Sequence, residues 1–218
     1  MPEHPLIHAA VIGATGYAGC ELLTLLARHP GASVTCLMSS GRDGKKPFAI
    51  EQSHPRLRGR FSVLCEPLNV EQVTGTGSEV VFLATPHETS HEIIPRLLES
   101  GLRVVDLSGA FRLKDPAAYA HWYDFDHHAA DALAEAVYGI PEFNAAAIAK
   151  ARLVANPGCY PTSVLLALVP LLKSGWVDVA AGIIADSKSG VTGAGRKPSD
   201  KLPNAMNNSR PMRMLRES

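Results

Sequence analysis

The fold is decided by residues 7–31, which read IHAAVIGATGYAGCELLTLLARHPG. Residues 7–12 form a short apolar run rich in β-branched residues, which predicts a buried strand. Glycines follow at positions 13, 16 and 19, and residues 21–29 predict a leucine-rich helix that Pro30 and Gly31 end. A strand, a glycine loop and a helix in this order are typical of dinucleotide-binding folds, in which the loop amides and the helix N-terminus receive a pyrophosphate.

The glycine spacing departs slightly from the usual dinucleotide fingerprint. It is G-x-x-G-x-x-G, one residue longer than G-x-G-x-x-G between the first two glycines. A plain tight turn is the alternative interpretation. If the loop binds a dinucleotide, the cofactor-contacting residues are Gly13, Thr15, Gly16, Tyr17 and Gly19.

The rest of the chain continues the alternation of strands and helices. We expect further strands at 33–38, 80–84, 103–107 and 153–155, and helices at 88–100 and 163–174. Such alternation predicts an α/β fold with a Rossmann-like parallel sheet and right-handed crossovers. A last strand at 182–186 is expected to open a second unit.

Composition limits the function classes. The chain has 218 residues, of which 46% are hydrophobic and 19% charged, with 21 basic and 21 acidic side chains. This balance excludes disorder of the whole chain and gives no global basic footprint for nucleic acid. The apolar run at 164–172 is too short to cross a bilayer, and residues 1–13 lack the features of a signal peptide. We therefore expect a soluble cytoplasmic protein without nucleic-acid or membrane partners.

The end of the second strand indicates which dinucleotide is bound. An Asp or Glu near this position would grip the ribose 2′-hydroxyl of NAD, but the strand ends at Met38 without one. Ser39, Ser40 and Arg42 follow instead, with Lys45 and Lys46 nearby, and they suit a 2′-phosphate. NADP(H) is the predicted cofactor, with a solvated basic loop as the alternative.

The four cysteines differ in their setting. Cys20, Cys36, Cys65 and Cys159 show no C-x-x-C spacing, which is typical of reduced thiols in a cytosolic protein. Cys159 follows the strand at 153–155 and precedes a helix, where the dipole favours the reactive thiolate. A buried structural cysteine is the alternative. A dinucleotide fold with an activated cysteine suggests acyl-enzyme chemistry coupled to hydride transfer.

Residues 117–143 are less regular and hold several His, Asp and aromatic side chains. A metal site is one interpretation of that density. Because the spacings match no familiar ligand pattern, we expect a surface loop with aromatic anchors instead.

Five motifs occur in the order seen in one known family. They are GATGYAG at 13–19, DLSGAFRL at 106–113, VYGIPE at 137–142, NPGCYPT at 156–162 and SKSGVTGAGR at 187–196. Over about residues 9–201 the chain resembles the N-acetyl-gamma-glutamyl-phosphate reductases. The related aspartate-semialdehyde dehydrogenases share the glycine loop and a catalytic cysteine but differ around the other motifs.

The resemblance implies an activity and a set of site residues. The enzyme would reduce N-acetyl-L-glutamyl 5-phosphate to N-acetyl-L-glutamate 5-semialdehyde with NADPH, in arginine biosynthesis, with Cys159 as the nucleophile. It implies cofactor contacts at Pro86, Ser189 and Gly190 and binding of the acyl phosphate substrate by the residues Arg112, Tyr138, Glu142 and Arg196. Thr85, Glu88 and Ala110 depart from the family pattern, and the family tends to form homo-oligomers.

The resemblance also divides the chain. Residues 1–157 correspond to the NADP-binding domain, 158–201 to the start of an incomplete α+β catalytic domain, and 202–218 to a tail foreign to the family, for which a shifted reading frame is one origin. No histidine follows His128, so the family's general-base histidine is missing. The alternatives are an inactive NADP-binding remnant, or a reductase of another acyl phosphate such as an aspartyl or aminoadipyl phosphate.

Overall fold

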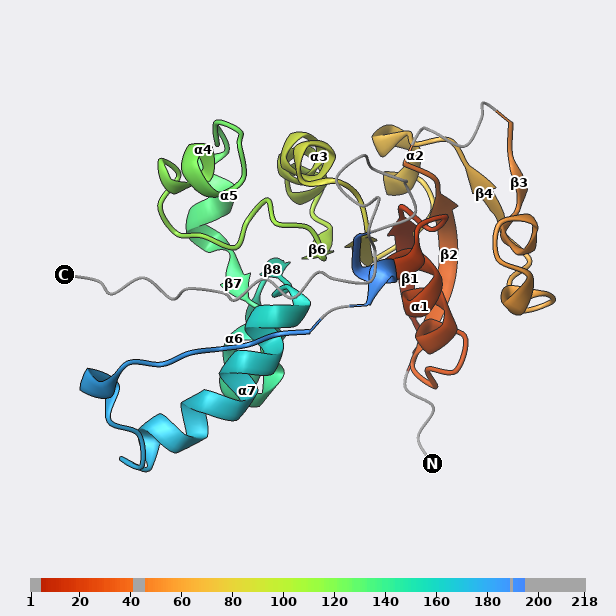
Figure 1. The fold of residues 1–218 in the computed structure, drawn as a ribbon. Helices are drawn as coiled ribbons and strands as arrows, with labels where there is room; N and C mark the ends of the chain where they lie inside the picture. The colour runs from red at the N-terminus through yellow and green to blue at the C-terminus, as the bar shows by residue number, and fades with distance from the viewer. Residues whose placement is uncertain (1–4, 41–45, 189, 195–218) are drawn as a thin grey trace. The chain divides into compact units, whose positions relative to one another are not determined.

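The computed structural model describes residues 5–40, 46–188 and 190–194 (Figure 1). The chain divides into two compact units, Met1–Pro157 and Gly158–Ser218. The first unit is an α/β domain built on one sheet, and the second begins with a long helix. Arg42, Ser189 and Arg196, which the sequence analysis assigns to the site, lie outside the described residues.

One sheet of eight strands organises the first unit, in the order β3-β4-β2-β1-β5-β6-β8-β7. The strands are β1 (Ile7–Ile12), β2 (Ala32–Met38), β3 (Phe48–Ala49), β4 (Leu64–Glu66), β5 (Val80–Leu83), β6 (Arg103–Asp106), β7 (Val137–Tyr138) and β8 (Leu153–Ala155). The β3–β4 pair is antiparallel, and the other neighbouring strands are parallel. The predicted Rossmann-like parallel sheet is confirmed.

Helices connect these strands. They are α1 (Tyr17–Leu26), α2 (Val70–Thr74), α3 (His87–Glu99), α4 (Ala118–Trp122), α5 (Ala130–Glu135) and α6 (Pro141–Lys150), with the 3₁₀ turns η1 (Ile50–Gln52) and η2 (Pro55–Leu57). The strands expected in the first unit agree with the structure to within one residue at each end. The helix α1 begins four residues earlier than expected, because the third glycine of the loop already belongs to it. The short strands β3, β4 and β7 were not predicted, since two or three residues carry no recognisable period.

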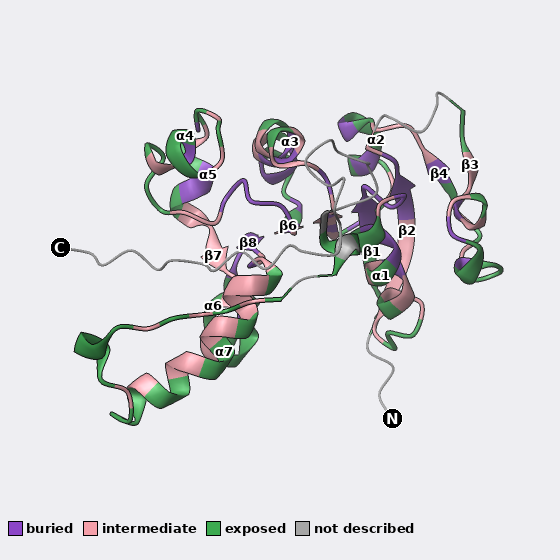
Figure 2. Cartoon of the chain, viewed as in Figure 1, coloured by how far each residue is buried: buried purple, intermediate pink, exposed green. Residues whose placement is uncertain are grey.

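The central strand β1 is buried on both faces (Figure 2). Its residues Ala10 and Ile12 belong to a hydrophobic cluster that includes Ile94 of α3. Val11 belongs to a second cluster, which includes Leu23 of α1. Because successive side chains of a strand point to opposite faces, α1 and α3 cover opposite faces of the sheet.

The prediction of a surface loop at 117–143 is wrong. The segment forms α4, α5 and β7, and it buries Tyr119 completely and His127 to 8% exposure. The Tyr119 hydroxyl accepts a hydrogen bond from the Leu113 amide at 2.8 Å. Its ring lies 4.5 Å from that of His127 between centroids, and Phe111 and His127 are 5.0 Å apart. The aromatic side chains thus form part of the core rather than surface anchors.

The prediction of a strand at 182–186 is also wrong. Among the described residues of the second unit, Ala185 alone is in a β-bridge, and Ile184 is 88% exposed. A strand requires a ladder of hydrogen bonds with a neighbour, and an apolar run without one stays irregular. This unit contains α7 (Cys159–Lys173) and the turns η3 (Val179–Ala181) and η4 (Val191–Ala194). No helix in the described parts of either unit is long and apolar enough to span a bilayer.

His127 should make the stability of the fold depend on pH. Neither ring nitrogen has a well-formed hydrogen bond among the described residues. Burial, with repulsion from His91 and His128, lowers its pKa from 6.5 to about 4, and the Ala110 backbone offsets only part of this. The neutral ring is therefore favoured in the folded state. The contribution of His127 to the free energy of unfolding is fully present above about pH 6.5 and is lost as the pH falls through about 4.

We expect His127→Phe to remove this pH dependence. Between about pH 7 and about pH 4.5, the wild-type free energy of unfolding should fall by about 2 kcal/mol more than that of the variant. Urea denaturation at both pH values measures the difference. The matched control is His121→Phe, which changes an exposed histidine of α4 and should leave the pH dependence as in the wild type. Identical pH profiles for His127→Phe and the wild type would contradict the assignment.

Candidate active site

The glycine loop lies at the carboxyl end of β1, where ligands bind in sheets of this kind. Gly13 has a φ of +85°, which favours glycine, and the amides of Gly13 and Ala14 donate to the Met38 carbonyl at 2.8 and 3.0 Å. A Cβ on Gly13 would lie 2.3 Å from the Ala84 carbonyl oxygen. The first glycine is thus required both by the backbone conformation and by the close approach to β5.

The other two glycines shape the start of α1. Gly16 is the N-cap, its amide donates to the Gly13 carbonyl at 3.1 Å, and no side chain caps the helix. A Cβ on Gly19 would lie 2.3 Å from the same Gly13 carbonyl. The first turn of α1 contains no acidic residue, and the amides of residues 17–19 have no backbone acceptor in the described chain. This uncapped, positively polarised helix start suits a pyrophosphate.

Thr15 and Tyr17 lie at the same place with different exposure. The Thr15 side chain is buried, whereas Tyr17, the first residue of α1, is 45% exposed. The Thr15 carbonyl accepts a hydrogen bond from Nε2 of His54 at 3.0 Å, so His54 supports the loop from a distant segment. Sequence reasoning missed His54, because a single histidine before a proline carries no motif.

Ser39 lies next to the glycine loop, directly after β2. It is buried, and its amide donates to the Glu66 carbonyl at 2.8 Å. Glu66, which the sequence analysis did not consider, pairs in register with Met38. Its carboxylate accepts a hydrogen bond from the Gln72 amide group.

Pro86 is the N-cap of α3, directly after the turn that follows β5. The neighbouring Thr85 hydroxyl is buried and lies 2.8 Å from the hydroxyl of Ser90, one turn into the helix. This contact holds the turn against α3. The structure thus places Pro86 at the same sheet edge as the glycine loop, since β1 and β5 are parallel neighbours.

A buried polar network occupies the carboxyl end of β6. Asp106 is fully buried, and it accepts hydrogen bonds from the Ser108 amide at 3.0 Å and hydroxyl at 2.8 Å. Burial raises the pKa of the Asp106 carboxyl, while hydrogen bonds from Ser108 and Ser90 and the charge of Arg112 act in the opposite direction. These partners satisfy a group that would otherwise be costly to bury.

Arg112 links the chain after β6 to the chain after β8. Its Nε donates to the Asn156 carbonyl at 2.8 Å, and its Nη2 donates to the Leu107 carbonyl at 2.9 Å. The predicted substrate residue therefore has a structural role in the segment that leads to Cys159. A guanidinium has five N–H donors, so these two bonds leave others for an anion.

Tyr138 and Glu142, the other described residues of the predicted substrate set, differ in environment. Tyr138 is half-buried in β7, and burial raises the pKa of its hydroxyl while the charge of Arg112 lowers it. Glu142 is exposed in the first turn of α6. The structure brings Tyr138 within the electrostatic reach of Arg112 and gives Glu142 no comparable contact among the described residues.

Cys159 is the first residue of α7, in the second unit. Gly158 is the extended N-cap, and its carbonyl accepts from both the amide and the hydroxyl of Thr162, at 3.0 and 2.8 Å. Cys159 is exposed, whereas the other three cysteines are buried. In Cys36, burial, with a smaller contribution from Glu66, raises the thiol pKa to about 11.

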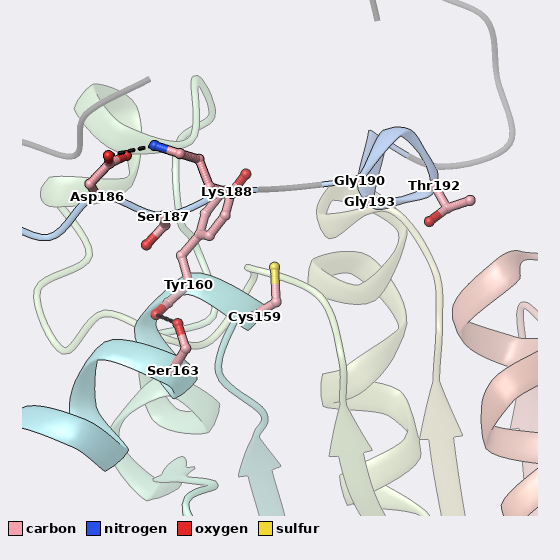
Figure 3. A pocket seen from close by; sticks show the side chains of 9 residues that line it. All are labelled: Cys159, Tyr160, Ser163, Asp186, Ser187, Lys188, Gly190, Thr192 and Gly193. Atoms are coloured by element: carbon pink, nitrogen blue, oxygen red, sulfur yellow. Dashed lines mark hydrogen bonds and ion pairs between the residues drawn. The ribbon is translucent and has the colours of Figure 1, made fainter. Parts of the chain in front are cut away.

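A pocket of about 540 Å³ surrounds the Cys159 thiol within the second unit (Figure 3). Its lining residues are Cys159, Tyr160, Ser163, Asp186, Ser187, Lys188, Gly190, Thr192 and Gly193. Asp186 pairs with Lys188 at 2.5 Å, so the pocket wall carries a cation together with a compensating carboxylate. The structure brings the predicted residues Cys159 and Gly190 together, and most of the additional lining residues come from the motif SKSGVTGAGR at 187–196. Among the described residues, no group of three or more His, Cys, Asp or Glu side chains could hold a metal.

Two family models match the chain. The model of the semialdehyde dehydrogenase NAD binding domain matches residues 8–151, and that of the semialdehyde dehydrogenase dimerisation domain matches residues 159–214. The second match extends past Lys201 into the segment that the sequence analysis treats as foreign.

Relatives of known name are similar over most of this chain. N-acetyl-gamma-glutamyl-phosphate reductases from Magnetococcus marinus and Geobacter metallireducens are 47% and 48% identical to it over 192 and 191 residues. Both alignments cover 88% of this chain and 54% of the relative. The chain thus spans about half the length of the curated relatives that it matches.

Solved structures support the same fold at lower identity. Aspartate semialdehyde dehydrogenase II from Vibrio cholerae is 22% identical with a TM-score of 0.56, over 88% of this chain and 49% of that one. The Candida albicans aspartate semialdehyde dehydrogenase with NADP is 17% identical with a TM-score of 0.55, over 85% of this chain and 56% of that one. Since the NAD binding domain model spans nearly all of the first unit and its glycine loop, the chain belongs to the semialdehyde dehydrogenase family.

Proposed function

We propose that this chain binds NADP(H) at the glycine loop and that Cys159 carries the acyl group in the reduction of N-acetyl-L-glutamyl 5-phosphate to N-acetyl-L-glutamate 5-semialdehyde. The observation that carries the proposal is the exposed Cys159 thiol at the start of α7, inside a pocket lined by hydroxyls, glycines and a lysine. The names of relatives at 47–48% identity support this substrate within the family.

The position of Cys159 supports its role as nucleophile. The helix α7 has 15 residues and no acidic residue in its first turn, so the positive end of its dipole lies at residue 159 without a compensating side-chain charge in that turn. In the proposed step, Sγ bonds to the acyl carbon, the bond from that carbon to the phosphate oxygen breaks, and phosphate leaves with the electron pair. The product is a thioester on Cys159, from which hydride addition and cleavage of the carbon–sulfur bond release the aldehyde and regenerate the thiolate.

The glycine loop supports the cofactor part of the proposal. The uncapped amides of residues 17–19 would hold the pyrophosphate, and Ser39 and Arg42 would lie on the side of the 2′-phosphate. Pro86 would lie on the nicotinamide side, and Ser189 and Gly190 are further proposed cofactor contacts. When bound, NADPH supplies the hydride for the thioester carbon.

Several groups could hold the anionic parts of the acyl phosphate. In the pocket, Lys188 and the hydroxyls of Ser187 and Thr192 offer donors for phosphate oxygens. Arg112, Arg196, Tyr138 and Glu142 complete the proposed substrate set, with Arg112 also holding the Asn156 carbonyl.

The same proposal places the protein in the cytoplasm, in L-arginine biosynthesis, as a homo-oligomer. The region that matches the dimerisation domain supports the last point.

The reverse reaction tests the substrate. The chain should reduce NADP⁺ when given N-acetyl-L-glutamate 5-semialdehyde and phosphate, and Cys159→Ser should abolish this activity. Aspartate semialdehyde and aminoadipate semialdehyde, assayed beside it, should give much slower reduction. Faster reduction of NADP⁺ with either of them would show that the substrate is another acyl phosphate. If none of the three aldehydes supports reduction and the acyl phosphate does not acylate Cys159, the chain is a dinucleotide-binding protein without reductase activity.

We expect Cys159 to be alkylated first. A brief, limiting dose of iodoacetamide should label residue 159 well before the other cysteines, because these are buried and Cys36 has a raised pKa. Peptide mass spectrometry identifies the labelled site. Cys159→Ser removes the rapid label, whereas Cys65→Ser should leave it unchanged. Predominant label on Cys36 or Cys65 would show that Cys159 is not the accessible thiol.

We also expect NADPH to bind more tightly than NADH. Arg42→Ala should lower the affinity for NADPH by about tenfold and leave the affinity for NADH unchanged, because a charge-assisted hydrogen bond to the 2′-phosphate is lost. Fluorescence titration of both cofactors measures the ratio. Lys150→Ala, which removes an exposed cation at the end of α6, is the control and should leave the ratio unchanged. Equal affinities of the wild type for the two cofactors would contradict the NADP preference.

A further inference from the structure

One peptide unit of the glycine loop is held at both ends. The Gly16 amide donates to the Gly13 carbonyl at 3.1 Å, and the Thr15 carbonyl accepts from His54 Nε2 at 3.0 Å. A peptide unit is planar, so two hydrogen bonds on opposite sides set its orientation. The amides of residues 17–19, which open α1, follow directly, and their direction depends on that orientation.

His54 is itself rigidly placed. Its amide donates to the Ile50 carbonyl at 3.0 Å, and its own carbonyl accepts from the Leu57 amide at 2.9 Å. His54 is 9% exposed, and Ile50 and Leu57 are 2% exposed each. Both of these apolar side chains belong to the hydrophobic cluster that includes Ala14 of the loop. The segment 50–57 is therefore packed against the glycine loop, and its core side chains hold the His54 backbone beside the Thr15 carbonyl.

A second contact joins the same segment to α1. Arg56 pairs with Glu21 at 2.6 Å, and its Nε lies 3.0 Å from the Cys20 sulfur. About half of the Arg56 side chain and more of Glu21 are exposed, and ion pairs of that kind contribute little. The buried bond from His54 to Thr15 is thus the stronger constraint on the loop.

We propose that His54 is a positioning residue of the cofactor site. Its Nε2–H donates to the Thr15 carbonyl and so holds the loop in the orientation in which the first amides of α1 receive the pyrophosphate. Since a carbonyl can only accept, Nε2 carries the proton. His54 acts through the loop without contacting the cofactor. This inference rests on the proposed binding of NADP(H) by the glycine loop.

Two substitutions separate the donor from the bulk of the ring. His54→Leu replaces the ring with an apolar side chain of similar volume and so removes the donor. It should weaken NADPH binding by about 5- to 20-fold. His54→Gln retains an N–H donor at a similar reach and should bind NADPH within about threefold of the wild type. Because the pyrophosphate is common to both cofactors, His54→Leu should lower the affinity for NADH by the same factor. This distinguishes the role of His54 from that of Arg42. Fluorescence titration of the full chain measures the affinities of the wild type and both variants for the two cofactors.

A control separates positioning from stability alone. Ile94→Val shortens a fully buried side chain of α3, and it should lower the thermal midpoint without changing the NADPH affinity measured well below that midpoint. Unchanged NADPH affinity in His54→Leu would overturn the inference, and so would equal weakening in His54→Leu and His54→Gln. If the wild-type chain itself fails to bind NADPH, the proposed cofactor function is wrong and the role of His54 is wrong with it.

Discussion

The close passage of Gly13 between two strand ends is the constraint on which the rest of the first unit depends. Its amide donates to the last residue of β2, while a Cβ at this position would collide with the carbonyl after β5. The chain can therefore turn at once from β1 into α1, with the helix start directly above the sheet edge. That placement leaves the positive end of α1 open and lets α1 cover one face of the sheet.

The polar side chains that follow β6 in the first unit are held by hydrogen bonds. Asp106 is held by Ser108, and Arg112 gives two of its donors to backbone carbonyls after β6 and β8. The cost of burying such groups is offset by hydrogen bonds, and the result is a set of turns with fixed geometry. His127 is an exception in the same unit, since it is buried without a well-formed hydrogen bond among the described residues.

The second unit has little hydrophobic core among its described residues. Its helix α7 begins with an exposed thiol and contains no buried residue, although its sequence is apolar. The pocket around Cys159 is built from the first turn of the helix and from an irregular polar stretch. An exposed sulfur at a helix start requires no large hydrophobic core around it.

The sequence by itself determined the parallel α/β fold, the glycine loop and Cys159, because these depend on local signals: apolar period, glycine spacing and a helix start. It misjudged 182–186 and 117–143, since pairing in a sheet and burial of aromatic rings depend on partners distant in the chain. Likewise, only the tertiary structure brought His54 to the Thr15 carbonyl, 39 residues away, and Arg112 to the Asn156 carbonyl, 44 residues away. Such contacts have no sequence period, because they arise where separate elements of the folded sheet meet.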